Sequence, residues 1–148
     1  MNHLTTTNLL YIQTEISDKL STKWQYKQYD ISLPISINNT LDYMLELHQK
    51  TLPLQKKIAK RLLHINKKIP IYVCDQLILF PLKHRRSPIQ YYINTYHITG
   101  KQTKNNGTLI MFSNATHLLV DEPYHAILKK WQESLLLCHL ITQSYSSY

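Results

Sequence analysis

The stretch that most constrains the fold of this chain runs from Lys67 to Tyr96, where two apolar segments flank a basic segment bounded by prolines. The first, Ile69 to Phe80, is rich in β-branched and large aliphatic residues and is stopped by Pro81, while the second, Tyr91 to Ile98, is aromatic and β-branched. Both compositions are typical of strands. The segment between them, Leu82 to Pro88, is too charged to be buried and too short to be a domain. We therefore expect a loop held out to solvent by a sheet.

Strand patterns also occur on both sides of this stretch. Loose alternation of apolar and polar residues predicts strands at Leu9 to Thr14 and at Tyr29 to Ile37, joined by a polar connection. Pro34 places the second of these at a sheet edge. Short apolar runs predict further strands at Ile71 to Val73, Leu77 to Phe80, Leu109 to Phe112 and His117 to Val120. Asn106-Gly107 favours a turn with positive φ, and Ser113-Asn114 fits a second turn.

Two segments are predicted to be helices, and a third is ambiguous. Asn39 or Thr40 is a candidate N-cap for a helix from Leu41 to Lys50, and Pro123 a candidate start for one that ends near Leu140. The predicted buried stripe of this last helix is Ile127, Leu128, Trp131, Leu135 and Cys138. Thr51 to Lys68 fits either a basic amphipathic helix or a loop followed by a short strand.

These elements predict an α+β fold: a single domain over residues 1–148, with a mainly antiparallel sheet, one helix before it and one C-terminal helix. A chain of 148 residues is long enough to bury a sizeable core without a covalent staple.

The composition argues against an enzyme. Gly100 and Gly107 are the only glycines, so the chain contains no phosphate-binding loop, dinucleotide fingerprint or nucleophile elbow. Its nine acids are dispersed, and the adjacent pair Asp121-Glu122 is explained as first-turn acids of the last helix. Glu122 and His125 have a metal-ligand spacing but lack the second copy that carboxylate-bridged sites use. We expect no catalytic residue, no metal and no cofactor.

The sequence also lacks membrane and secretion signals. Its first twenty residues contain no basic run followed by an apolar core, and no window approaches eighteen uncharged apolar residues. A cytoplasmic protein without a membrane partner is the expectation.

The net charge of +8 is concentrated in the middle of the chain. Residues 50 to 104 contain twelve Lys/Arg against one acid, Asp75, whereas the remainder contains five Lys/Arg and eight acids. This segregation favours a polyanionic partner over a merely solvated basic face. A basic module that docks an acidic protein or an anionic surface is the alternative interpretation.

Double-stranded DNA fits this pattern. Arg85 and Arg86 lie in the proline-bounded loop and could enter a minor groove, whose potential is most negative over A·T tracts, with Lys83 and His84 beside them. The residues expected to contact flanking phosphates are Lys56, Lys57, Lys60, Arg61, Lys67 and Lys68. Tyr91, Tyr92 and Tyr96 are either base-stacking platforms or half-buried strand aromatics.

Several motifs, in order, resemble the ComK family of competence transcription factors. They are K-K-I-P-I at Lys67 to Ile71, L-F-P at Leu79 to Pro81, Y-I-N-T-Y-H-I at Tyr92 to Ile98, F-S-N at Phe112 to Asn114, and Tyr124-His125 ahead of a Trp-containing helix. The similarity is strongest over Lys67 to Leu137 and extends in register from Leu41.

The resemblance implies an activator of DNA-uptake genes that binds AT-rich boxes through the minor groove as a homo-oligomer, either a dimer or a tetramer. Two departures from the family pattern stand out. A Gly-Arg-containing segment of the family is replaced here by Leu54 to Lys57, so the backbone there is expected to differ. The family's tail, which carries a signal for a proteolytic adaptor, has no counterpart before Tyr148, so we do not expect control by that adaptor.

Overall fold

The computed structural model describes residues 8–16, 19–83 and 86–146 of the chain. These residues form three α-helices, one short 3-10 helix and nine strands. The elements are β1 Leu9–Ile16, β2 Leu20–Tyr26, β3 Asp30–Leu33, α1 Ile37–Glu46, α2 Leu52–Leu63, β4 Ile71–Cys74, β5 Leu77–Pro81, β6 Tyr91–Asn94, η1 Thr95–His97, β7 Ile98–Lys104, β8 Gly107–Phe112, β9 His117–Val120 and α3 Tyr124–Ser146.

The larger sheet has six antiparallel strands in the order β3-β2-β1-β6-β5-β4. It joins the N-terminal strands to the predicted Lys67–Tyr96 stretch through pairing of β1 with β6. The prediction of a polar connection between the first two predicted strands was wrong, because this segment contains the strand β2. In that strand, buried Thr22, Trp24 and Tyr26 alternate with half-exposed Lys23 and Gln25. Because the buried Thr22 is polar, the alternation of apolar and polar residues that indicates a strand is not visible in the sequence. The strand before Pro34 is indeed at the sheet edge but is shorter than predicted.

The first helix begins earlier than its sequence indicated. Ser36, not Asn39 or Thr40, is the N-cap of α1, and its hydroxyl accepts a hydrogen bond from the Asn39 amide at 3.1 Å. The helix ends at Glu46, so the expected extension to Lys50 was also wrong. Leu41, Met44 and Leu45 are fully buried and pack in one cluster with Trp24.

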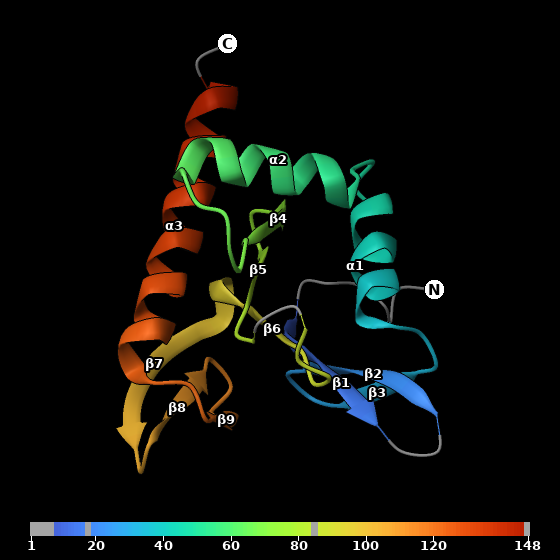
Figure 1. Cartoon of the computed structure of the whole chain (residues 1–148), viewed down its shortest axis with the longest axis vertical. Coiled ribbons are helices and arrows are strands. Elements are labelled where there is room, and N and C mark those ends of the chain that lie inside the picture. The colour runs from blue at the N-terminus through green and yellow to red at the C-terminus, as the bar shows by residue number, and fades with distance from the viewer. Residues whose placement is uncertain (1–7, 17–18, 84–85, 147–148) are drawn as a thin grey trace.

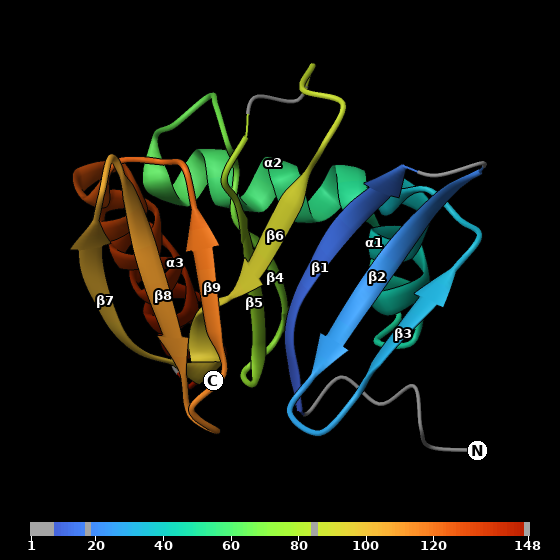
Figure 2. The same ribbon diagram turned by 90° about the horizontal axis from the view of Figure 1, so that it is seen from below.

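The run from Tyr91 to Ile98 is not one strand. The chain turns after Asn94, whose side chain accepts a hydrogen bond from the Tyr96 amide and caps η1, and it then enters a second sheet as β7. This sheet has three antiparallel strands in the order β7-β8-β9. The turn therefore separates the two sheets, which stand side by side in Figure 2.

Gly107 opens β8 where it passes close to β9. A Cβ at this position would lie 2.1 Å from the backbone oxygen of Val120. Glycine is needed here for close approach and not for positive φ, which occurs instead at Asn105, with φ 55°. We expect Gly107→Ala to lower the free energy of unfolding by about 1 to 3 kcal/mol through overpacking, measured by urea denaturation. Gly100→Ala is the matched control, because its Cβ would meet only the flexible Met111 tip at 2.9 Å. Equal losses of stability in both variants would contradict this explanation.

The last helix, α3, is longer than predicted and buries a partly different stripe. Ile127 and Leu137 are buried and Trp131 is half-buried, but Leu135 is 43% exposed, so its predicted burial was wrong. Asp121 and Glu122 precede the helix and do not lie in its first turn. Their carboxylates pair with Lys83 instead.

Three hydrophobic clusters hold these elements together. One lies between α1 and the larger sheet, one joins both sheets to the first half of α3, and one joins α2, β4 and β5 to its second half. Figure 1 shows α3 along one side of the molecule and α2 crossing its upper part. The predicted α+β class with mainly antiparallel strands is confirmed. The order differs, because both α1 and α2 are inserted between strands of the same sheet.

Candidate nucleic-acid interface

The ambiguous segment after Lys50 forms a helix, α2, followed by a loop. Thr51 is its N-cap and accepts a hydrogen bond from the Leu54 amide at 3.4 Å, and the helix ends at His64 in the left-handed region, with φ 55°. Ala59 is buried against β4, β5 and α3 residues in the third cluster. Lys57, Lys60 and Arg61 are exposed and Lys56 is half-buried. Lys60 and Arg61 occupy the last turn, where cations interact favourably with the helix dipole.

A cleft of about 390 Å³ gathers five lysines from three separate segments, and we call it the basic cleft. Lys56 and Lys60 come from α2, Lys67 and Lys68 from the loop after it, and Lys83 from the chain after β5. No carboxylate lines this cleft within the described residues. The other lining residues are Asn66, Ile69, Pro81, Gln90 and Tyr92. This concentration of positive charge suits an anionic ligand.

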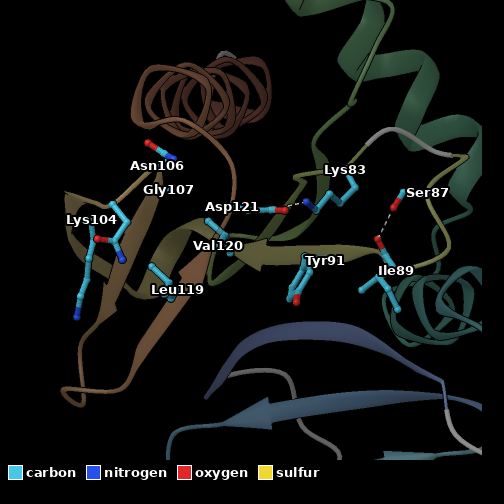
Figure 3. Close-up of a pocket in the computed structure, with 11 residues that line it drawn as sticks. Lys83, Ser87, Ile89, Tyr91, Lys104, Asn106, Gly107, Leu119, Val120 and Asp121 are labelled. Atoms are coloured by element: carbon cyan, nitrogen blue, oxygen red, sulfur yellow. Dashed lines mark hydrogen bonds and ion pairs between the residues drawn. The ribbon is translucent and has the colours of Figure 1, made fainter.

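Lys83 differs from the other four lysines of the basic cleft because its ammonium forms ion pairs with two carboxylates. Its ammonium pairs with Glu122 at 2.7 Å. It also pairs with Asp121, and Figure 3 draws this second contact. Partial burial lowers the pKa of Lys83, but the hydrogen bonds to Asp121 and Glu122 outweigh burial and raise it overall. The same contact lowers the pKa of Asp121. Lys83 therefore connects the start of the loop from Leu82 to Gln90, here called the basic loop, to the residues that follow β9.

The loop from Leu82 to Gln90 is pinned at its base. The Leu82 amide donates to the Tyr91 carbonyl at 3.2 Å, closing the loop. Thr14 and Gln90 exchange two hydrogen bonds: the Thr14 amide donates to the Gln90 carbonyl at 2.9 Å, and the Gln90 amide donates to the Thr14 hydroxyl at 3.1 Å. The sheet thus holds the described ends of the predicted loop, but Leu82, expected in the solvent-exposed segment, is 2% exposed and packs in the second hydrophobic cluster.

The described part of this loop lies at the upper edge of Figure 2. Arg86 is exposed on the loop. His84 and Arg85, two more of the predicted groove-contacting residues, lie outside the described residues. Lys57 and Arg61 line an open groove of about 490 Å³ on α2, together with Pro53, Lys56 and Lys60.

The tyrosines of the predicted platform do not share one surface. Tyr92 is half-buried and lines the basic cleft, and burial raises the pKa of its phenol. Tyr91 lines a separate hollow of about 650 Å³ between the loop and the second sheet, shown in Figure 3. Tyr96 is 52% exposed beyond the end of β6. Half-burial at Tyr91 and Tyr92 favours their interpretation as strand aromatics.

Apart from Tyr92, the sequence did not indicate the polar residues that complete the cleft. Asn66, Gln90 and Tyr92 line it beside the lysines. The Asn66 and Tyr92 side chains can donate a hydrogen bond to an anion, whereas the Gln90 side-chain amide donates to the Ser87 carbonyl at 2.8 Å. They are brought together by the pairing of β6 with β5 and by the loop after α2. No local pattern marks such residues, because their proximity depends on strand order.

Neither a metal-binding cluster nor a membrane-spanning helix occurs among the described residues. No group of three or more His, Cys, Asp or Glu side chains is arranged to hold a metal ion in the described part of the chain. None of the helices described there is long and apolar enough to cross a membrane.

The fold and site define a small α+β protein whose basic side chains gather in a cleft beside a pinned loop. The sequence profile described as ComK protein matches residues 4–145 of the 148-residue chain. The chain therefore belongs to the ComK family, which is a family of competence-related transcription factors. Searches of curated proteins and of solved structures found no match. The resemblance in the sequence motifs is thus confirmed over nearly the whole chain.

Proposed function

We propose that this protein is a DNA-binding activator of competence genes that recognises AT-rich boxes through the minor groove. The observation that carries the proposal is the convergence of lysines from α2, the following loop and the end of β5 on one cleft beside the basic loop. A continuous phosphate backbone is the anion that such an extended basic surface suits best. Family membership supports transcription as the process.

The basic residues divide into two roles. Lys56, Lys60, Lys67 and Lys68 contact phosphates in the basic cleft, and Lys57 and Arg61 extend the contact along α2. Arg85 and Arg86 enter the groove, where the narrow minor groove of A·T tracts attracts arginine. Lys83 positions the loop through Asp121 and Glu122.

The protein acts in the cytoplasm as a homo-oligomer, a dimer or a tetramer, without a cofactor and without catalysis. The hydrophobic clusters described above are filled by the chain's own elements. Oligomer formation is therefore expected to add cooperativity between boxes and not to be required for folding. Analytical sedimentation of the free protein, and of its complex with a duplex that carries two boxes, measures the oligomeric state in each case.

Replacing Arg85 and Arg86 by alanine tests the groove assignment. The double variant is expected to lose about 1 to 3 kcal/mol of binding free energy per groove contact, and to lose its preference for AT boxes over GC-rich duplex. Fluorescence anisotropy with both labelled duplexes measures these quantities. Lys27→Ala is the control, because Lys27 lies in the β2–β3 turn, at the edge of Figure 2 opposite the loop. Unchanged AT preference in the arginine variant would remove the loop from the interface.

A further inference from the structure

Residues 66–68 are shared by two cavities, and we call this segment the 66–68 ridge. Asn66, Lys67 and Lys68 line the basic cleft and also line a second cavity of about 570 Å³. The second cavity, here the α3 cleft, is bounded by the first turns of α3. Its charged and titratable lining residues are Lys67, Lys68, Glu122, His125, Lys129, Lys130 and Glu133.

The ridge is held in place by a residue of α3. The Lys130 ammonium donates to the Lys67 carbonyl at 3.0 Å and pairs with the Glu133 carboxylate at 2.7 Å. Lys68 has φ 49°, a left-handed conformation that is uncommon for a residue with a side chain and that persists where surrounding contacts enforce it. Lys130 thus fixes the backbone that presents Lys67 and Lys68 to both cavities.

The charge of the α3 cleft is not balanced by its acids. Glu133 is paired with Lys130, and Glu122 with Lys83. In the described part of the chain, no ion pair matches Lys67, Lys68 or Lys129. Like charges gathered without counter-charges repel one another, so the cluster is stabilised when an anion binds. The same holds for the basic cleft across the ridge.

We propose that the α3 cleft binds the DNA backbone together with the basic cleft, so that one strand crosses the 66–68 ridge with a phosphate on each side. Lys129 contacts the phosphate in the α3 cleft, and Lys130 is a positioning residue that acts through the Lys67 carbonyl. This inference rests on the proposed function for its ligand, duplex DNA. It extends the interface from α2 to α3, which the charge pattern of residues 50 to 104 did not include.

The salt dependence of binding tests the proposal directly. Each phosphate contact contributes about −0.9 to the slope of log K against log salt concentration for duplex DNA. Lys129→Ala is expected to reduce the steepness of that slope by about this amount, equally for AT-box and GC-rich duplex, because phosphate contacts carry no sequence information. Lys27→Ala should leave the slope unchanged. A wild-type slope in Lys129→Ala, alongside a reduced slope in Lys60→Ala, would overturn the proposal.

Lys130 is tested by a pair of variants. Lys130→Met keeps the aliphatic stem but cannot hold the Lys67 carbonyl, so both phosphate-binding lysines of the ridge are displaced and the slope should become shallower than that of Lys129→Ala. Lys130→Arg can still donate and should restore most of the slope. If Lys130→Met and Lys130→Arg have equal slopes, Lys130 does not position the ridge.

Different results would reject the proposed preference for AT-rich boxes and the proposed DNA contact in the α3 cleft. Equal affinity of the wild type for AT-box and GC-rich duplex, with a reduced slope in Lys129→Ala, would reject the proposed sequence preference and retain the α3 cleft as a backbone site. Binding to phosphatidylglycerol vesicles that depends on Lys129, with duplex binding that does not, would show that the cleft takes a lipid headgroup and would overturn the inference.

Discussion

Replacement of Asn94 by alanine is expected to lower the free energy of unfolding by about 3 to 5 kcal/mol, because several buried backbone groups lose their partner at once. Asn94 has no exposed surface. Its amide nitrogen donates to the Leu9 carbonyl at 2.8 Å and to the Gln76 carbonyl at 3.0 Å. Its oxygen accepts from the Ile78 and Tyr96 amides, each at 3.2 Å. One side chain therefore joins β1, the β4–β5 turn, β5 and the turn into the second sheet.

Urea denaturation followed by far-ultraviolet circular dichroism measures this loss of stability. Asn39→Ala is the matched control, because the Asn39 side chain is exposed on α1 and should change stability by less than about 0.5 kcal/mol. A loss below about 1 kcal/mol in Asn94→Ala would mean that water or relaxation replaces the bonds of Asn94 and that it does not organise the junction between the sheets.

The second large effect is expected from removing the unmatched lysines of the basic cleft. Converting Lys56, Lys60, Lys67 and Lys68 to glutamine should reduce the steepness of the log K against log salt slope by about 3 to 4. The phosphate contacts proposed for these four lysines carry no sequence information, so affinity for every duplex should fall together. Fluorescence anisotropy over a series of salt concentrations measures the slope.

A control with the same change in net charge separates local contact from overall charge. Asn8→Asp, Lys27→Glu and Gln28→Glu together also lower the net charge by four, but they lie where β1 begins and where β2 turns into β3, on the edge of Figure 2 opposite α2. This variant should keep most of the wild-type slope. Equal slopes in the two variants would show that only the net charge of the protein matters and that the basic cleft is not a specific contact surface.

The parts of the fold that were predictable have strong local patterns. The apolar runs that became β4 and β5, the start of α3 after Pro123, and the loop between Pro81 and Tyr91 all follow from residue type and spacing. The helical alternative for Thr51 to Lys68 proved right because Thr51 caps α2 and Ala59 packs in the third cluster.

The parts that were missed depend on tertiary contacts. β2 was hidden because Thr22 is polar yet buried, with its hydroxyl donating to the Ile35 carbonyl at 2.8 Å. The break inside Tyr91 to Ile98 is imposed by the bonds of Asn94, which reach residues far away in sequence. Propensity alone favours a continuous strand there.

The candidate site was predictable in residue type but not in arrangement. Charge counting identified Lys56, Lys60, Lys67 and Lys68, which the structure brings to one cleft. It could not show that Lys83 is matched by Asp121 and Glu122, since these lie close only when β9 ends beside the start of the loop. The ridge and Lys130 were missed for the same reason.

The most direct test of the central claim is a titration of the wild-type protein with AT-box and GC-rich duplexes of equal length at two salt concentrations. Minor-groove recognition by the basic loop predicts tighter binding to the AT box at both concentrations. Equal affinity for the two duplexes at both concentrations would contradict recognition of AT-rich boxes and leave only general binding to polyanions.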